Sequence, residues 1–402
     1  MAGPSLLLDF AVLLIAAEVG GTLFRFLHLP RVVGMVVAGI VLGPFTPGYV
    51  VNPSDVADLA LLGAVFLMFS TGLSFDIRTF RKLGGGPFLL AGLGVGASFA
   101  LGLGLGALVG WDLLPSLFLG LVLTSTSSTL GLKFLAELDL TSMPGVELVT
   151  AAILIDDILA LVLMTIAVGF ASPAAPSPIG LFTGLAILLG LALLLVWLGS
   201  HALPRILRGV DRFSPSSTMM VALSAGLFVS FAFAVLGLPP LVGAFFAGSI
   251  VASTEYGARV SRQMSAVSTI FMGVFFTSIG FQINPNLLVG VLGLALAAIG
   301  IAVVGKVVPG VLVIPRLAGV DRVGAWRLSA VLVPRAEISL IIAQYGLLVS
   351  RRAELLPLAM MVMLGTALLP GLLVKVPRRN PPGDSRTPEA PPEDRSAGDP
   401  KR

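Results

Sequence analysis

The chain has 402 residues, of which 56% are hydrophobic and only 11% charged, with a net charge of +4. Soluble domains carry about 25% charged residues, so the composition excludes a soluble globular protein and indicates a polytopic membrane protein. The absence of cysteine excludes disulfides and thiolate metal sites, and His28 and His201 are too few for a histidine metal cluster. Nucleic-acid binding is not expected, because the basic residues lie in short loops.

Apolar stretches long enough to cross a bilayer follow one another along most of the chain. The first begins at Leu6 without a preceding basic segment or a small-residue cleavage site, so we expect a retained span. From Pro377 onward the chain is rich in proline and charge, which predicts a disordered cytoplasmic tail over 377–402 after a transmembrane domain over 1–376. The thirteen predicted spans are 5–27, 30–45, 56–75, 87–110, 113–136, 146–170, 178–201, 216–236, 239–253, 263–283, 286–314, 326–349 and 355–375.

Lysine and arginine are distributed unevenly between the two sides that these spans define. If the connection after the first span and every second connection beyond it are cytoplasmic, 21 of the 25 basic residues lie there or in the C-terminal segment. The opposite side holds only Arg351 and Arg352, while Lys306 and Arg335 fall inside spans. Because positive residues accumulate on the cytoplasmic side, we expect a multi-pass protein of the cell inner membrane, with its N-terminus outside and its C-terminus inside.

Two distant segments resemble each other and predict an internal repeat. The stretch "LHLPRVVGMVVAGI" at the second span matches "LGLPPLVGAFFAGSI" at the ninth with a constant offset of 209 residues. These spans are seven apart, so the two copies cross the membrane in opposite directions, as in the inverted repeats of secondary transporters. A shared helix-packing motif of small residues is the alternative. The matched residues include Pro30 and Pro239, and Gly39 and Gly248; one span later, Ser70 and Gly72 match Ser278 and Gly280 at an offset of 208.

The repeat also indicates where helices are interrupted. The fifth span carries the hydroxyl run "TSTSST", and the corresponding twelfth span carries Pro334, which lacks a backbone donor. Irregular backbone at membrane depth is tolerated only inside protein or beside water, where half-helix ends offer partial charges to ions. We therefore expect two crossed discontinuous helices, the alternative for the hydroxyl run being a continuous helix with side-chain bonds to its own backbone.

The ionisable residues expected at membrane depth are Asp156, Asp157, Lys306, Arg335 and Glu337, with Glu18 as a further candidate. Each ionised carboxylate at a bilayer centre costs about 2.5–3.5 kcal/mol. Adjacent helical residues point about 100° apart, so one aspartate can pair with a buried cation while the other faces a cavity. A structural salt-bridge network is the alternative, although hydrophobic replacements often stabilise a protein better than buried ion pairs.

This charged set suits proton-coupled cation transport. Burial and a like-charged neighbour both favour the protonated form of a carboxylate, which lets it exchange a proton for a cation. Carboxylates, hydroxyls and the carbonyls of broken helices are oxygen ligands that suit a hard monovalent ion, so the expected metal site at Asp156 and Asp157 is a Na+ site. Lys306 paired with one aspartate can release a proton on demand.

The segments "LPRVVGMVVAGIVLGP", "FLMFSTGLSFDIRTFRKLG", "TSTSST", "LIDDILA", "VGKVVPGVL" and "PRAEISL" occur in the order typical of the monovalent cation/proton antiporter-2 superfamily. The Asp-Asp pair with a distant lysine resembles its NapA-type bacterial Na+/H+ antiporters. The resemblance implies an all-α NhaA/NapA-like antiporter fold of about 13 transmembrane helices, assembled as a homodimer. It also implies dimerisation helices over about 5–45 and 178–253, and core transport helices over about 56–170 and 263–375.

The resemblance further implies roles for single residues. Asp157 is implied as the main carrier of cation and proton, and Asp156 as the partner of Lys306 in one state. Ala336 stands where the family usually has glycine, so the close backbone packing that glycine allows is not expected at that point. The residues implied to support the site are Thr126, Ser127, Arg335 and Glu337.

The expected function is secondary active exchange of Na+, or Li+, for protons by elevator-type alternating access. We expect this exchange to be electrogenic and to need neither a cofactor nor enzymatic activity. The nearest alternative is a K+/H+ antiporter of the same superfamily. A sodium-coupled organic-anion symporter would not need the Asp-Asp and lysine set. An intramembrane aspartyl protease would need its aspartates on separate helices, whereas Asp156 and Asp157 are adjacent.

Overall fold

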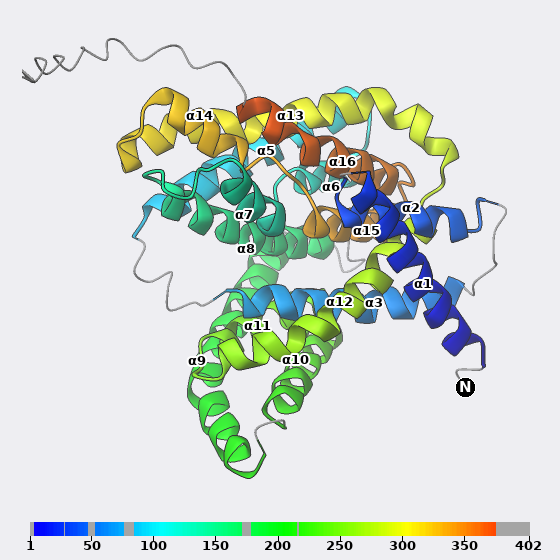
Figure 1. Ribbon diagram of the computed structural model, residues 1–402, viewed down its shortest axis with the longest axis vertical. Helices are drawn as coiled ribbons and strands as arrows, with labels where there is room; N and C mark the ends of the chain where they lie inside the picture. Colours follow the sequence, from blue (N-terminus) through cyan, green and yellow to red (C-terminus); the bar gives the residue numbers. More distant parts are fainter. Residues whose placement is uncertain are drawn as a thin grey trace, which may run out of the picture.

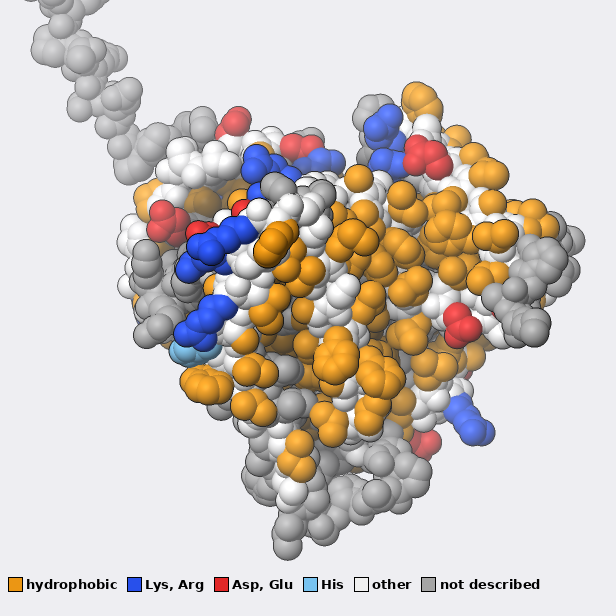
Figure 2. All heavy atoms as spheres, turned by 90° about the horizontal axis from the view of Figure 1, so that it is seen from below, with side chains coloured by type: hydrophobic (Ala, Val, Ile, Leu, Met, Phe, Trp, Pro, Cys, Tyr) orange, Lys and Arg blue, Asp and Glu red, His pale blue; other side chains and the backbone are white. Residues whose placement is uncertain are grey.

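The computed structural model describes residues 4–27, 29–46, 53–75, 84–170, 178–214 and 217–374, and every regular element within them is a helix (Figure 1). His28 and the tail expected over 377–402 lie outside these residues. Eight described helices are long and apolar enough to cross a membrane, and four shorter apolar helices accompany them. Figure 2 shows a face covered largely by hydrophobic side chains, with Lys and Arg along its margins, as a lipid-facing surface requires.

The first half of the chain contains α1 (Pro4–Phe26), α2 (Arg31–Leu42), α3 (Pro53–Leu73), α5 (Gly86–Leu108), α6 (Leu113–Val122), α7 (Ser128–Glu137) and α8 (Val146–Phe170). After α9 (Pro178–Phe213), the second half contains α10 (Ser217–Val235), α11 (Pro240–Ala252), α12 (Gly257–Phe281), α13 (Asn286–Ala318), α14 (Arg322–Ala330), α15 (Glu337–Ser350) and α16 (Leu355–Val374). The same order of long and short helices therefore occurs twice among the described elements.

The helices pack into two groups. The panel group, α1–α3 and α10–α12, packs within itself, and so does the core group, α5–α8 and α13–α16. The connecting helix α9 contacts α8 of the core group and α10 and α11 of the panel group, and with α10 it forms the lower end of the molecule in Figure 1. Each group thus takes equivalent helices from both halves of the chain.

The packing differs at two spans from the expected division. Residues 56–75 and 263–283 were expected among the core transport helices, but α3 and α12 pack against panel helices. The physical reason is that the glycines of α3 and α12 let these helices approach the backbones of other helices closely. The facing surfaces that fit them belong to panel helices. The other expected core segments, 87–170 and 286–375, pack with one another, and the expected dimerisation segments 5–45 and 178–253 contain panel helices together with α9. Which group forms a dimer stays a prediction.

Two reciprocal crossings hold the panel group together. At the crossing of α2 with α12, a Cβ on Gly39 or on Gly280 would lie 2.0 Å from a backbone oxygen of the facing helix. At the crossing of α11 with α3, a Cβ on Gly248 or on Gly72 would lie 2.2 Å from such an oxygen. Gly39 matches Gly248 and Gly72 matches Gly280 in the repeat, so each crossing is the counterpart of the other.

The repeated proline residues have a shared local role. Pro30 and Pro239 both precede a short helix with φ of −59°, as the N-caps of α2 and α11. In both copies the third residue beyond the proline donates its N–H to the proline carbonyl at 3.1 Å, from Val33 and from Val242. The sequence match therefore reflects the same turn into the same helix, in addition to close helix packing.

The connecting helix is longer than the expected span over 178–201, since α9 continues to Phe213. The added turns carry Arg208, whose guanidinium lies 3.1 Å from the carboxylate of Glu255 in the connection between α11 and α12. Asp211 is paired with Arg259 at the start of α12. Charged side chains thus continue the helix beyond its apolar part and bind its end to the panel group.

Candidate functional site

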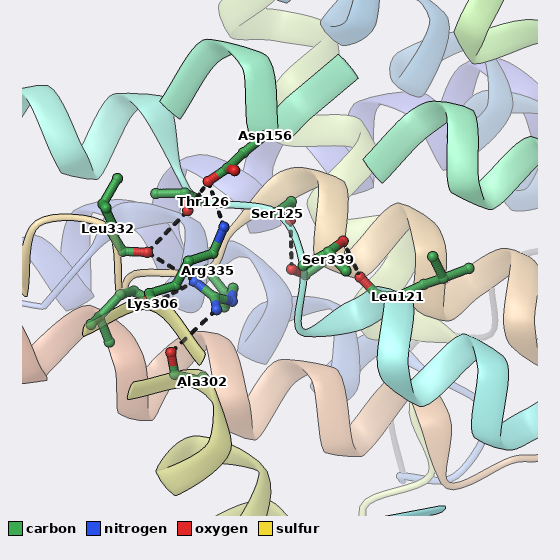
Figure 3. Close-up of polar contacts among 11 residues, drawn as sticks. Leu121, Ser125, Thr126, Asp156, Ala302, Lys306, Leu332, Arg335 and Ser339 are labelled. Carbon is green, nitrogen blue, oxygen red and sulfur yellow. Dashed lines mark hydrogen bonds and ion pairs between the residues drawn. The ribbon is translucent and has the colours of Figure 1, made fainter. Parts of the chain in front are cut away.

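Two interruptions of helices meet in the core group. Residues 123–127 separate α6 from α7, and residues 331–336 separate α14 from α15. The backbone N–H of Ser127 donates to the carbonyl of Pro334 at 2.8 Å, and the hydroxyl oxygen of Thr126 lies 3.0 Å from the carbonyl oxygen of Leu332. The two irregular segments therefore cross in contact, and both place backbone polar groups deep within the protein (Figure 3).

Local chemistry explains both interruptions. Pro334 has no N–H for a helical bond, which ends the regular pattern in the second segment. In the first segment the hydroxyl of Thr124 donates to the carbonyl of Leu121 at 2.7 Å, and Ser127 caps α7 by accepting the N–H of Leu130 at 3.3 Å. Serine and threonine thus replace helical backbone bonds at this point.

A buried ion pair lies beside the crossing. Lys306 on α13 and Asp156 on α8 approach to 2.6 Å between Nζ and Oδ2, with 1% of each side chain exposed. The hydroxyl of Thr126 donates to the same carboxylate oxygen at 2.7 Å, while Oδ1 has no hydrogen-bond partner within the described part of the chain. Gly94 on α5 provides room for the lysine, since a Cβ there would lie 3.2 Å from its Cδ.

Asp157 has different surroundings from its neighbour. It is 3% exposed, and its carboxylate has no hydrogen-bond or ion-pair partner among the described residues. The charged groups that act on it are Glu337, Asp156 and Lys306. An almost buried carboxylate without a partner is costly, which is typical of a group that must bind a proton or a cation.

Arg335 binds carbonyl groups of the irregular segment that follows α14. It is fully buried, and its Nη1 donates to the carbonyls of Leu332 and Val333 at 3.1 and 2.8 Å. Its backbone N–H donates to the hydroxyl of Thr366 on α16 at 3.0 Å. Arg335 forms no ion pair with Glu337 within the described residues; Glu337 lies instead in the first turn of α15, where the helix dipole favours negative charge.

Two contributors were not selected from the sequence. Ser125 and Ser339 are 2.9 Å apart across the crossing, and the hydroxyl of Ser339 donates to the carbonyl of Val122 at the end of α6. Ser125 belongs to the "TSTSST" run, and Ser339 follows Glu337 by two residues. The sequence places both serines beside the two expected interruptions, which could have singled them out. The contact between Ser125 and Ser339 could not be predicted, because it depends on how the two segments cross.

Buried opposite charges at the crossing of two interrupted helices, built from two related halves, are features of a secondary transporter of ions. The protein is a cation/proton antiporter and belongs to the sodium/hydrogen exchanger transmembrane family, whose model matches residues 12–378. The members that the chain resembles are transporters rather than enzymes.

Relatives of known activity extend along nearly the whole chain. The Na(+)/H(+)-K(+) antiporter GerN of Bacillus cereus is 28% identical over 372 residues, covering 91% of this chain and 94% of the relative. The K(+)/H(+) antiporter subunit KhtU of Bacillus subtilis is 27% identical, covering 92% of each. The solved sodium proton antiporter MjNhaP1 of Methanocaldococcus jannaschii shares the fold, with a TM-score of 0.72 at 13% identity over 92% of this chain and 99% of that one.

Proposed function

We propose that the protein exchanges Na+, or Li+, for protons across the cell inner membrane, and that Asp157 carries the cation and the proton in turn. The observation that carries this proposal is the contrast between two adjacent carboxylates. Asp156 is paired with Lys306 at 2.6 Å, whereas Asp157 is almost buried without a partner among the described residues. Only the second carboxylate is ready to bind an ion without first breaking a bond.

The exchange follows from charge balance at an almost buried carboxylate. Asp157 is neutral with a proton or with a monovalent cation, so each replaces the other without leaving a buried charge. The hydroxyl of Thr126, 2.7 Å from Asp156, supplies an oxygen beside the carboxylates. A cation close to both carboxylates weakens the hold of Asp156 on Lys306, which can then lose its proton. One cation exchanged for more than one proton moves net charge.

Potassium is the second candidate substrate. The relatives include the K(+)/H(+) antiporter subunit KhtU as well as antiporters named for Na+. Carboxylate, hydroxyl and carbonyl oxygens serve both ions. Sodium is favoured in this proposal because two carboxylates, Asp156 and Asp157, stand side by side at the crossing, and a smaller ion gains more from concentrated negative charge.

We further propose that the core group moves across the membrane relative to the panel group, and that the panel helices form a homodimer. Packing within each group, with α9 as the connection, supports this division. The panel also exposes large apolar side chains on α1 and α10, suited to a second copy or to lipid: Ile15, Val19, Phe228 and Phe231.

The proposed orientation has the N-terminus outside and the C-terminus in the cytoplasm. Arg351 and Arg352 would then lie on the outer side, where basic residues are not expected. For Arg352, contacts with neighbouring residues account for the position. Arg352 lies with its guanidinium 4.9 Å from the ring centre of Trp111 and 3.4 Å from the carboxylate of Glu354. Arg352 thus joins two loops of the core group, so its place on the outer side does not contradict the accumulation of basic residues on the cytoplasmic side.

Reconstituted transport tests the proposal, and Asp157→Asn is the decisive variant. In proteoliposomes with a pH-sensitive dye, Na+, Li+ and K+ are added in turn, and we expect proton flux that Asp157→Asn abolishes. The variant should unfold at the same temperature as the unsubstituted protein or a higher one, because it removes an unpartnered buried charge. Normal exchange by a folded Asp157→Asn protein would place the carrier elsewhere.

A further inference from the structure

Three hydroxyl side chains follow one another through the interruption between α6 and α7. Thr124, Ser125 and Thr126 are each buried, with 2% or less of the residue exposed. A hydroxyl has one proton and two lone pairs, and a metal cation binds only the lone pairs. The direction of each hydroxyl proton therefore decides whether that oxygen is available to a cation.

Two of the three protons have fixed acceptors. Thr124 Oγ1 donates to a backbone carbonyl of α6 at 2.7 Å, and Thr126 Oγ1 donates to the carboxylate of Asp156 at 2.7 Å. Neither a carbonyl nor a carboxylate can donate in return, and the Leu332 carbonyl 3.0 Å from Thr126 Oγ1 is also only an acceptor, so both hydroxyls act as donors. Ser125 differs, because its partner at 2.9 Å is the hydroxyl of Ser339, and either oxygen of such a pair is able to donate.

Ser339 determines the direction of the pair. Its Oγ lies 2.7 Å from the carbonyl oxygen of Val122, the last residue of α6, which can only accept. The single proton of Ser339 is therefore used in this bond, and Ser125 must donate to Ser339 (Figure 3). The lone pairs of Ser125 then face no donor among the described residues, one residue away from the carboxylate contact made by Thr126.

We propose that Ser125 is a cation ligand of the exchange site and that Ser339 is the positioning residue that turns its lone pairs toward the cation. This assignment rests on the proposed function. Ser339 acts from the first turn of α15, across the crossing, so the ligand geometry depends on both interruptions. Because the number and spacing of oxygen ligands set the fit of a hard cation, the pair contributes to the choice among Li+, Na+ and K+.

The test measures apparent KM and kcat for each of the three cations in proteoliposomes. We expect Ser125→Ala and Ser339→Ala each to raise the KM for the preferred cation about tenfold and to change the ratios between cations, with a smaller effect on kcat. The double variant should be no worse than either single one, because both changes remove the same ligand. Ser339→Thr, which keeps a hydroxyl, should retain the original ratios.

Ser329→Ala is the matched control, since among the described residues this buried hydroxyl on α14 bonds only the carbonyl of Ala325 in its own helix. Its cation ratios should equal those of the unsubstituted protein. Equal KM increases for all three cations, or additive effects of the two alanines, would identify a brace and overturn the assignment. If Ser339→Ala does not fold, an unchanged KM in Ser125→Ala overturns it equally. No flux with any cation in the unsubstituted protein would instead overturn the proposed function, and this assignment with it.

Discussion

The pairing of Lys306 with Asp156 has consequences for stability and for charge movement. Lys306→Gln leaves a buried carboxylate without its cation, and we expect the protein to lose about 3–5 kcal/mol of unfolding free energy. The double variant Asp156→Asn/Lys306→Gln should recover most of this loss, because neither charge then remains. Thermal unfolding in detergent measures both.

The same substitution tests the proton stoichiometry. Any transport that survives in Lys306→Gln should no longer respond to an imposed membrane potential, because the lysine no longer contributes a second proton. Flux is measured in proteoliposomes with and without a K+ diffusion potential, using Na+ as the transported cation. If the unsubstituted protein already ignores the potential, Lys306 is a structural strut and the exchange is one for one.

Arg335 offers a second residue-scale prediction. Replacing it by methionine removes the donors for two buried carbonyls, at Leu332 and Val333, which should cost about 2–5 kcal/mol of unfolding free energy. Arg335→Lys should recover only part, because an ammonium lacks the planar fork of donors. Arg208→Met is the control. The Arg208 side chain is 59% exposed in its ion pair with Glu255, so we expect the unfolding free energy to change by less than about 1 kcal/mol. Equal losses at both positions would contradict the capping role of Arg335.

At the scale of elements, the reciprocal crossings of the panel group are the most sensitive packing feature. Gly39→Ala and Gly248→Ala each place a methyl group within 2.2 Å of a backbone oxygen, so the helices must separate. We expect each to destabilise the protein by about 1–3 kcal/mol, and to similar extents, because the crossings are counterparts. Thermal unfolding measures the effect.

Gly300→Ala on α13 is the control for the crossing glycines, because a Cβ there meets nothing within 4 Å. Alanine favours a helix over glycine, so this variant should be unchanged or stabilised by about 1 kcal/mol. A loss at Gly300 as large as at Gly39 would show that helix glycines act through the backbone alone and not through the crossings.

Apolar runs were sufficient to predict an all-helical membrane protein, and the proline at 334 and the hydroxyl run mark the two places in the core group where helices end. The number of spans stays a prediction. The group to which α3 belongs was not predictable, because Gly72 meets a helix more than 170 residues further along the chain. The buried charges of the site were predictable from their cost in a membrane. Ser339 was not, since a serine such as Ser329, bonded within its own helix, has the same local sequence character.

At the scale of the whole molecule, the proposed motion requires the two groups to separate and meet again. A cavity of about 200 Å³ lies between them, lined by Ile158 of the core group and Phe246 of the panel group. Cysteines at these two positions, joined by a bifunctional reagent, should stop exchange. The protein has no cysteine of its own, so the reagent acts only there.

The control for this cross-link joins Phe88 to Ile155, which line the same cavity from two helices of the core group. With this control pair joined, exchange should continue near its original rate. In the Ile158–Phe246 pair, reductive cleavage of the reagent should restore exchange. Undiminished turnover with the two groups joined would show that the site opens to both sides without their relative movement.

The reciprocal glycine crossings also govern how the protein is made. Gly39 leaves the ribosome about 240 residues before Gly280, so α2 enters the membrane long before its partner exists. Each half of the chain carries one side of both crossings, and neither half finishes its packing alone. A chain cut between α9 and α10 and produced as two polypeptides should therefore accumulate only when both pieces are synthesised together, each acting as the assembly template of the other.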